Sequence, residues 1–176
     1  LPDDVVDVAV ADFDEDDVQD VAALSASTRM IRILAGAGDG RLSVVLEFEA
    51  PDQAIAIATA DINGDAHKDL VVVSNGADVL KVFLGNGFGE FDEGFVFATG
   101  RGPVAFTLVD LNPTQNRLAD VVLVNGDGQN EVVYCKGMEL IVADGKTGKT
   151  KYTAPTPATP ANTPAPRNRF PRILGD

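Results

Sequence analysis

Residues 61–69 read DINGDAHKD and separate two apolar segments, residues 55–60 and 70–74. Side chains that carry oxygen stand at the first, third, fifth and ninth positions of this stretch, namely Asp61, Asn63, Asp65 and Asp69. Carboxylates packed this closely repel one another unless a positive charge lies among them. The stretch is therefore either a solvated polar turn or a loop that binds a cation.

The stretch belongs to a repeat of 49 residues. An apolar run precedes each of Asp12, Asp61 and Asp110, and successive members of this series are 49 residues apart. The glycine-rich segments GAGDGRL (residues 36–42) and GNGFGEF (residues 85–91) have the same offset. Self-similarity at a fixed period is the signature of a repeat architecture.

Each repeat unit predicts four short strands. Runs rich in Val, Ile and Phe alternate with clusters of Gly, Asn and Asp, which is typical of strands joined by tight turns. No segment keeps an apolar period of about 3.6 residues, so we expect no helix. The expected strands are residues 8–11, 20–24, 30–34 and 43–48 in the first unit, 55–60, 70–74, 79–84 and 95–98 in the second, and 106–109, 121–124, 132–135 and 139–143 in the third.

Four strands in every ~50 residues are typical of the blades of a β-propeller. The sequence predicts repeat 1 at residues 1–49, repeat 2 at residues 50–98, repeat 3 with an extra hairpin at residues 99–152, and an extended tail rich in Pro and Thr at residues 153–176. Because propellers close with about 4 to 8 blades, three units predict an incomplete ring or a fragment of a larger one.

The acidic stretches and the glycine-rich turn also carry a family resemblance. DFDEDDVQD (residues 12–20), DINGDAHKD and the following LGNGFGEF (residues 84–91) resemble FG-GAP/VCBS-type repeats, as found in integrin-like propellers. The resemblance extends over roughly residues 1–137. It implies an all-β fold of repeated four-stranded antiparallel blades, and it implies that the acidic loops bind Ca²⁺.

Calcium takes about 6 to 8 oxygen ligands, and alternate positions of a tight loop supply them efficiently. Side chains at positions 1, 3, 5 and 9 and the main-chain carbonyl at position 7 form the predicted set. In loop one (residues 12–20) the predicted ligands are Asp12, Asp14, Asp16, the carbonyl of Val18, and Asp20. In loop two (residues 61–69) they are Asp61, Asn63, Asp65, the carbonyl of His67, and Asp69.

Both loops depart from the family pattern at position 6, where the sharp turn favours glycine and a positive φ. Loop one has Asp17 there and loop two has Ala66. The third loop keeps Asp110, Asn112 and Thr114, but its closing acid, Asp120, comes two residues late. We expect loop one to bind calcium best and the third loop least, and the sequence leaves open whether the third loop binds metal at all.

The net charge of −13 argues against nucleic-acid binding, which needs a basic face, and against adsorption to anionic membranes. No run of about 18 or more apolar residues predicts membrane insertion. Oxygen-rich loops favour hard cations over transition metals. The single histidine, His67, lies in a predicted calcium loop, so we expect no catalytic pair with the single cysteine, Cys135, and no Ser–His–Asp triad. Paired carboxylates of the kind that hydrolyse glycosides are not excluded by the sequence, so it leaves open whether the protein is an enzyme.

These features predict a calcium-binding propeller module that recognises a protein or a glycan and is extracellular, at the cell surface or periplasmic. Two alternatives stay open. The chain could be a fragment of a propeller enzyme that degrades polysaccharides, such as a lyase, or a structural element that assembles through open blade edges. Exposed strand edges pair readily with other chains, so self-association is a further expectation.

Overall fold

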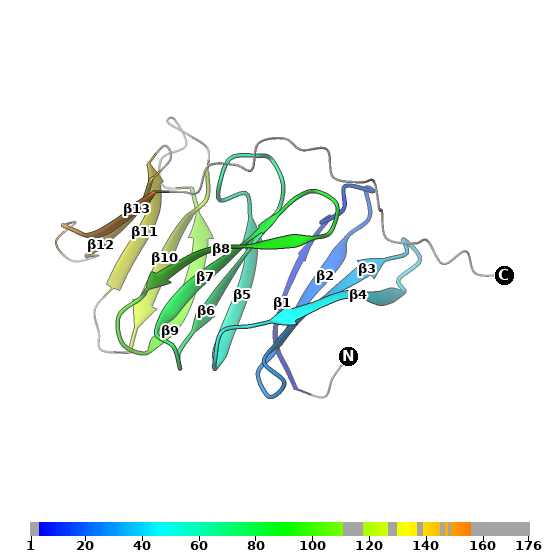
Figure 1. Ribbon diagram of the computed structural model, residues 1–176, viewed down its shortest axis with the longest axis horizontal. Coiled ribbons are helices and arrows are strands. Elements are labelled where there is room, and N and C mark those ends of the chain that lie inside the picture. Colours follow the sequence, from blue (N-terminus) through cyan, green and yellow to red (C-terminus); the bar gives the residue numbers. More distant parts are fainter. Residues whose placement is uncertain are drawn as a thin grey trace.

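The computed structural model of the 176-residue chain describes residues 4–110, 118–126, 130–136, 139–144, 147 and 149–155. Within these residues the chain forms thirteen strands and no helix, which confirms the all-β expectation (Figure 1). The described part therefore contains no helix with the length and apolarity needed to span a membrane. The strands form three sheets that lie one after another along the molecule.

The first sheet is an antiparallel meander in the order β1-β2-β3-β4. Its strands are β1 (Val5–Ala11), β2 (Asp20–Ser25), β3 (Met30–Gly36) and β4 (Leu42–Glu49). The sequence of β2, DVAALS, does not alternate between apolar and polar residues, and nearly the whole strand is buried. A strand covered on both faces has no solvent side, so the alternation expected of a half-buried strand is lost.

The second sheet repeats this arrangement in the order β5-β6-β7-β8. Its strands are β5 (Ala54–Ala60), β6 (Asp69–Ser74), β7 (Val79–Gly85) and β8 (Phe91–Ala98). Every residue of β6 is buried, as the central position of this sheet requires. β8 begins at Phe91, four residues before the expected start, because Phe91 already pairs with Gly85 of β7.

The third sheet has five strands in the order β13-β12-β11-β10-β9. Its strands are β9 (Pro103–Val109), β10 (Asp120–Asn125), β11 (Asn130–Lys136), β12 (Glu139–Asp144) and β13 (Thr150–Pro155). The fifth strand pairs antiparallel with β12 and extends the outer side of the sheet.

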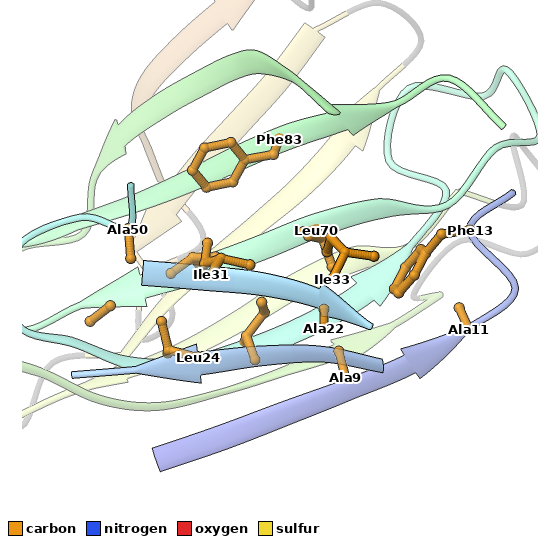
Figure 2. Close-up of a cluster of buried hydrophobic side chains, with 13 residues drawn as sticks. Ala9, Ala11, Phe13, Ala22, Leu24, Ile31, Ile33, Ala50, Leu70 and Phe83 are labelled. Carbon is orange, nitrogen blue, oxygen red and sulfur yellow. The ribbon is translucent and has the colours of Figure 1, made fainter. Parts of the chain in front are cut away.

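A hydrophobic core fills the space between the first and second sheets (Figure 2). Its buried members include Leu24, Ile31 and Ile33 from the first sheet and Ile57, Leu70 and Phe83 from the second. Phe13 belongs to this core although it lies in loop one, and its ring meets that of Phe91 edge-on at 5.4 Å between centroids. Burying one Phe side chain contributes about 1.5 to 3 kcal/mol, so the packing of the two sheets also anchors loop one.

A second core joins the second and third sheets. Ile62, from loop two, is fully buried in it, as Phe13 is in the first core. Val121 and Leu123 of β10 supply the third sheet's buried contribution. Loops one and two therefore each place their second residue in the core toward the following sheet.

Candidate metal centre

The strand register fixes where each acidic loop begins and ends. Ala11 pairs with Asp20, and Ala60 pairs with Asp69, so each loop leaves the end of one strand and closes on the first residue of its neighbour. Val109 and Asp120 form the same pair in the third sheet. The register therefore puts an aspartate at the same corner of each of the three sheets.

Asp12 organises loop one through the backbone. One of its carboxylate oxygens accepts the N–H of Asp16 at 3.1 Å, and the other accepts the N–H of Asp17 at 2.8 Å. These bonds fold the loop back onto its own first residue, as short Asp side chains commonly do in turns. The loop also contains two left-handed residues, Glu15 with φ 58° and Asp17 with φ 68°.

Asp20 closes loop one and ties it to the next hairpin. Its two carboxylate oxygens accept the N–H of Phe13 and the N–H of Gly36, each at 2.9 Å. Asp20 is almost fully buried, and this burial raises the pKa of its carboxyl group. A Cβ on Gly36 would lie 2.2 Å from the carbonyl oxygen of Gln19, so the close approach requires glycine.

Asp14 is the most unusual carboxylate of loop one. Its side chain is 8% exposed, and its Oδ1 atom is buried without a hydrogen-bond partner. Burial, followed by the charges of Asp16, Asp20 and Asp12, raises the pKa of Asp14 to about 6. A buried polar atom without a partner is uncommon and costs about 1 to 3 kcal/mol.

Asp12, Asp14 and Asp20 form a compact group of oxygen donors. One carboxylate oxygen from each lies within 4.8 Å of the other two. Across the described residues, no other group of three or more His, Cys, Asp or Glu side chains converges in this way. Asp16, a predicted ligand, lies outside the group, and its Oδ1 accepts the N–H of Val18 at 2.9 Å.

Loop two repeats the backbone frame of loop one. Asp61 accepts the N–H of Gly64 at 2.6 Å and that of Ala66 at 3.0 Å. The loop again has two left-handed residues, Gly64 with φ 86° and Ala66 with φ 74°. The sixth position therefore has a positive φ in both loops although neither has glycine there.

The inner side chains of loop two bond to each other. The amide nitrogen of Asn63, which cannot bind a cation, donates to Asp65 Oδ2 at 2.9 Å. The other oxygen of Asp65 accepts the N–H of His67 at 2.9 Å. Asp61, Asp65 and Asp69 thus do not converge as the three carboxylates of loop one do.

Asp69 holds the closing position of loop two. It accepts the N–H of Ile62 at 2.8 Å and that of Gly85 at 2.9 Å, and it is fully buried. Burial raises the pKa of Asp69 to about 7. As in the first sheet, a Cβ on Gly85 would lie 2.1 Å from a carbonyl oxygen, here that of Lys68.

The first two loops touch at their tips. Nδ1 of His67 lies 2.7 Å from Oε1 of Glu15, and the N–H of Gly89 donates to the carbonyl of Phe13 at 2.9 Å. A Cβ on Gly64 would lie 3.3 Å from Leu118, which is the corresponding approach of loop two to the third sheet. Residues 111–117, with Asn112 and Thr114 of the third loop, lie outside the described residues.

Sequence reasoning did not find Gly36, Gly85, or the contact between Glu15 and His67. The signal for the two glycines was present, because each lies 16 residues after the closing aspartate of its loop and the two are 49 residues apart. The contact between the loops joins residues 52 positions apart and depends on how the sheets pack.

A comparison of the sequence with models of known protein families identifies the type of repeat. Residues 12–72 match the family model described as FG-GAP-like repeat. Residues 12–72 therefore carry the pattern of an FG-GAP-like repeat. The match spans both acidic loops and the strands between them, and it confirms the resemblance predicted from DFDEDDVQD and DINGDAHKD.

A solved structure places the fold of this chain among β-propellers. The crystal structure of BBS1N in complex with ARL6DN, soaked with lead, is similar with a TM-score of 0.53 and 11% sequence identity. The similarity covers 87% of this chain and 57% of the other, so this chain spans a little over half the length of that propeller-containing chain. At this identity the likeness shows the fold alone. No curated protein sequence gives a significant match.

The three sheets are therefore propeller-type blades, called blade 1 (β1–β4), blade 2 (β5–β8) and blade 3 (β9–β13) below. Across the described residues they follow one another without closing into a ring (Figure 1).

Proposed function

We propose that this chain is a calcium-binding propeller module that recognises a protein or a glycan outside the cell, at the cell surface or in the periplasm. The observation that carries the proposal is the buried carboxylate group of loop one. Its oxygen-only donor set, with no nitrogen or sulfur, suits a hard divalent cation. Asp12, Asp14 and Asp20 would supply carboxylate ligands, with Asp16 and the carbonyl of Val18 as the further ligands expected from loop position.

The energetics of loop one favour a cation. Two unit charges 4.8 Å apart repel by about 3.5 kcal/mol at an effective dielectric constant of 20. Three carboxylates create three such pairs, and the unpartnered Oδ1 atom of Asp14 adds a desolvation cost. A divalent cation among these oxygens would convert the repulsion into attraction and give that atom a partner.

Calcium in loop one would also brace the junction between blades 1 and 2. Phe13 of the loop is buried in the core between these blades, and its carbonyl accepts the N–H of Gly89 from blade 2. Glu15 reaches His67 of loop two. A loop fixed by its cation would hold these contacts in place, so the ion would stiffen the propeller rather than take part in chemistry.

The proposed location outside the cytoplasm is based on the calcium concentration that such a loop needs to be occupied. Loop sites in extracellular modules bind calcium with dissociation constants of about 10⁻⁴ to 10⁻³ M. Such sites fill in extracellular fluid, where calcium is in the millimolar range, and stay largely empty where calcium is scarce. To test recognition, immobilised glycans and candidate proteins are probed with the chain in calcium and in EDTA. Binding of equal strength in the two conditions would argue against a role for the ion in recognition.

Thermal unfolding in EDTA and in millimolar Ca²⁺ tests the metal assignment. A ligand that binds only the folded state at a hundredfold excess over its dissociation constant adds about 2.7 kcal/mol to the free energy of unfolding. We expect a clear rise in melting temperature with Ca²⁺ and a smaller one with Mg²⁺ at equal concentration. The calcium assignment is wrong if the melting temperatures in EDTA and in Ca²⁺ are equal.

Asp14→Asn makes the test specific. The amide keeps the size of the side chain but removes one of three clustered charges, so the variant should melt higher than wild type in EDTA. It should also lose most of the rise caused by calcium. Asp92→Asn, at an exposed position of β8 outside both loops, is the matched control and should change neither value. A variant that melts lower than wild type in EDTA and keeps the full calcium response would contradict the role given to Asp14.

A further inference from the structure

Blade 2 holds the two residues that flank Asp14 in loop one. On one side, Phe13 is buried in the core between blades 1 and 2 (Figure 2), and its carbonyl accepts the N–H of Gly89 at 2.9 Å. On the other side, Oε1 of Glu15 lies 2.7 Å from Nδ1 of His67. Because both neighbours of Asp14 in the chain are fixed to blade 2, the direction of the Asp14 side chain depends on blade 2 as well.

The contact between Glu15 and His67 occupies a space that a glycine leaves open. A Cβ on Gly87, in the turn between β7 and β8, would lie 2.5 Å from Nδ1 of His67 and 2.9 Å from Oε1 of Glu15. Since a carboxylate only accepts hydrogen bonds, Nδ1 of His67 carries the proton and donates to Glu15. Loop one, loop two and the turn between β7 and β8 therefore all meet at this contact.

The backbone of Glu15 needs this support. Glu15 has φ 58°, a left-handed conformation that a residue with a long side chain rarely adopts. Its side chain is 56% exposed, so burial contributes little to holding the residue there. The hydrogen bond from His67 stabilises this conformation, and residue 15 sets the course of the chain between Asp14 and Asp16.

Loop two has the same backbone frame but lacks this contact. Its second residue, Ile62, is buried as in loop one. The residue 49 positions after Glu15 is Gly64, which has no side chain to reach the next blade. Asn63, the equivalent of Asp14, is only partly buried and donates its amide to another side chain of its own loop. Of these two loops, the one whose fourth residue is tied to the next blade is the one whose third side chain is buried.

We propose that His67 is a positioning residue for the calcium site of loop one: by holding Glu15, it keeps Asp14 directed at the other two carboxylates of the group. The inference rests on the proposed calcium site, and it adds that blade 2 completes this site. A loop that is already held in its binding geometry loses less conformational entropy when the ion binds. The coupling is reciprocal, so a contact that strengthens calcium binding is itself strengthened by the ion.

Isothermal titration of the full chain with Ca²⁺ tests this role. His67→Ala removes the hydrogen bond but keeps the main-chain carbonyl of residue 67, and it should weaken calcium binding about three- to fivefold, the effect of losing a partly exposed pair. In a Glu15→Ala chain the same change should have no further effect, because the contact is already absent. Gln19→Ala, at an uncharged and exposed position of loop one, is the matched control and should keep the wild-type affinity.

Hydrogen exchange in EDTA tests the same role without the ion. The N–H groups of Asp16 and Asp17 bond to Asp12 in the folded loop, so their exchange reports whether the loop keeps its geometry. We expect peptides that cover residues 12–20 to exchange faster in His67→Ala than in wild type or in Gln19→Ala. Unchanged exchange of β6 establishes that the variant is folded.

The outcomes separate the role of His67 from the calcium assignment. A wild-type chain that binds no calcium would refute the proposed function, and the exchange of residues 12–20 would still decide whether His67 holds the loop. Equal exchange of these residues in wild type and His67→Ala would overturn the positioning role, as would equal calcium affinities of the two chains, while the calcium site itself would stand. His67→Gln, whose amide can donate to Glu15, should keep most of the affinity, and a loss as large as that of His67→Ala would also count against the role.

Discussion

Loop two has an alanine where its backbone favours glycine. Ala66 has φ 74°, in the left-handed region that costs an L-residue about 1 to 2 kcal/mol. Its methyl group is exposed, so it contributes little packing in return. The N–H of Ala66 donates to Asp61, and this bond holds the residue in its conformation.

Ala66→Gly should therefore stabilise the protein. Glycine removes the strain of about 1 to 2 kcal/mol but loses about 0.5 to 1 kcal/mol more conformational entropy on folding. The net gain is about 0.5 to 1 kcal/mol in the free energy of unfolding. For a chain of this length, that corresponds to a rise of about 1 to 4 °C in melting temperature.

Ala105→Gly provides a control with the opposite sign. Ala105 is also exposed, but it lies inside β9, and its φ is not positive. Glycine has more conformational freedom than alanine in the unfolded chain and loses it when the strand forms. Ala105→Gly should therefore lower the free energy of unfolding by about 0.5 to 1 kcal/mol. Both variants are measured by urea unfolding in EDTA, so that calcium binding does not contribute. Equal signs for the two variants would refute the argument from backbone strain.

Two further perturbations test the closing aspartates and their surroundings. Gly85→Ala would bring a methyl group to 2.1 Å from the Lys68 carbonyl oxygen, so it should lower the free energy of unfolding by about 2 to 3 kcal/mol. The control is Gly40→Ala, whose methyl group would meet no atom within 4 Å and which should cost only about 1 kcal/mol. Urea unfolding measures both variants. In EDTA, the raised pKa values of Asp14 and Asp69 mean that the folded chain keeps protons that the unfolded chain has released above about pH 4. The free energy of unfolding should therefore fall by several kcal/mol, on the order of 5, as the pH rises from 4 to 7, and a value that rises with pH would contradict the burial of these two carboxyl groups.

Much of the fold could be predicted because the same information occurs more than once in the chain. The 49-residue offset aligns weak strand signals with each other, so a run such as residues 20–24 is supported by residues 69–73 even though neither alternates. β2 and β6 begin at or next to the predicted residues for this reason. The extra strand β13 and the early start of β8 were harder to place, since both depend on pairing with a neighbouring strand.

The candidate site was predicted at the level of residue type and spacing, but its internal contacts were not. Sequence spacing treats Asp12, Asp14, Asp16 and Asp20 as equal ligands. The structure separates them, because the Asp16 side chain bonds to the backbone of its own loop while Asp14 has a buried oxygen without a partner. Such differences depend on how the loop folds over the strand ends, which a one-dimensional pattern does not contain.

The closing aspartate and a distant glycine act as one structural unit in the first two blades. Asp20 accepts the N–H of Gly36, and Asp69 accepts the N–H of Gly85. Each glycine also lies so close to the carbonyl that precedes the aspartate that no side chain fits. The unit fixes the end of the acidic loop to the end of the third strand, and it requires both residues.

The third blade departs from this unit at both places. In blade 2, Leu70 pairs with Phe83, and Gly85 follows two residues later. In blade 3, Val121 pairs with Val133, so the residue two positions later, Cys135, takes the place of the glycine. A residue with a Cβ cannot approach the preceding carbonyl as glycine does in blades 1 and 2. The closing acid, Asp120, also comes two residues late in the sequence. Two independent departures therefore support the expectation that the third loop binds calcium least, and Asp120→Asn should reduce the calcium-induced rise in melting temperature less than Asp14→Asn does.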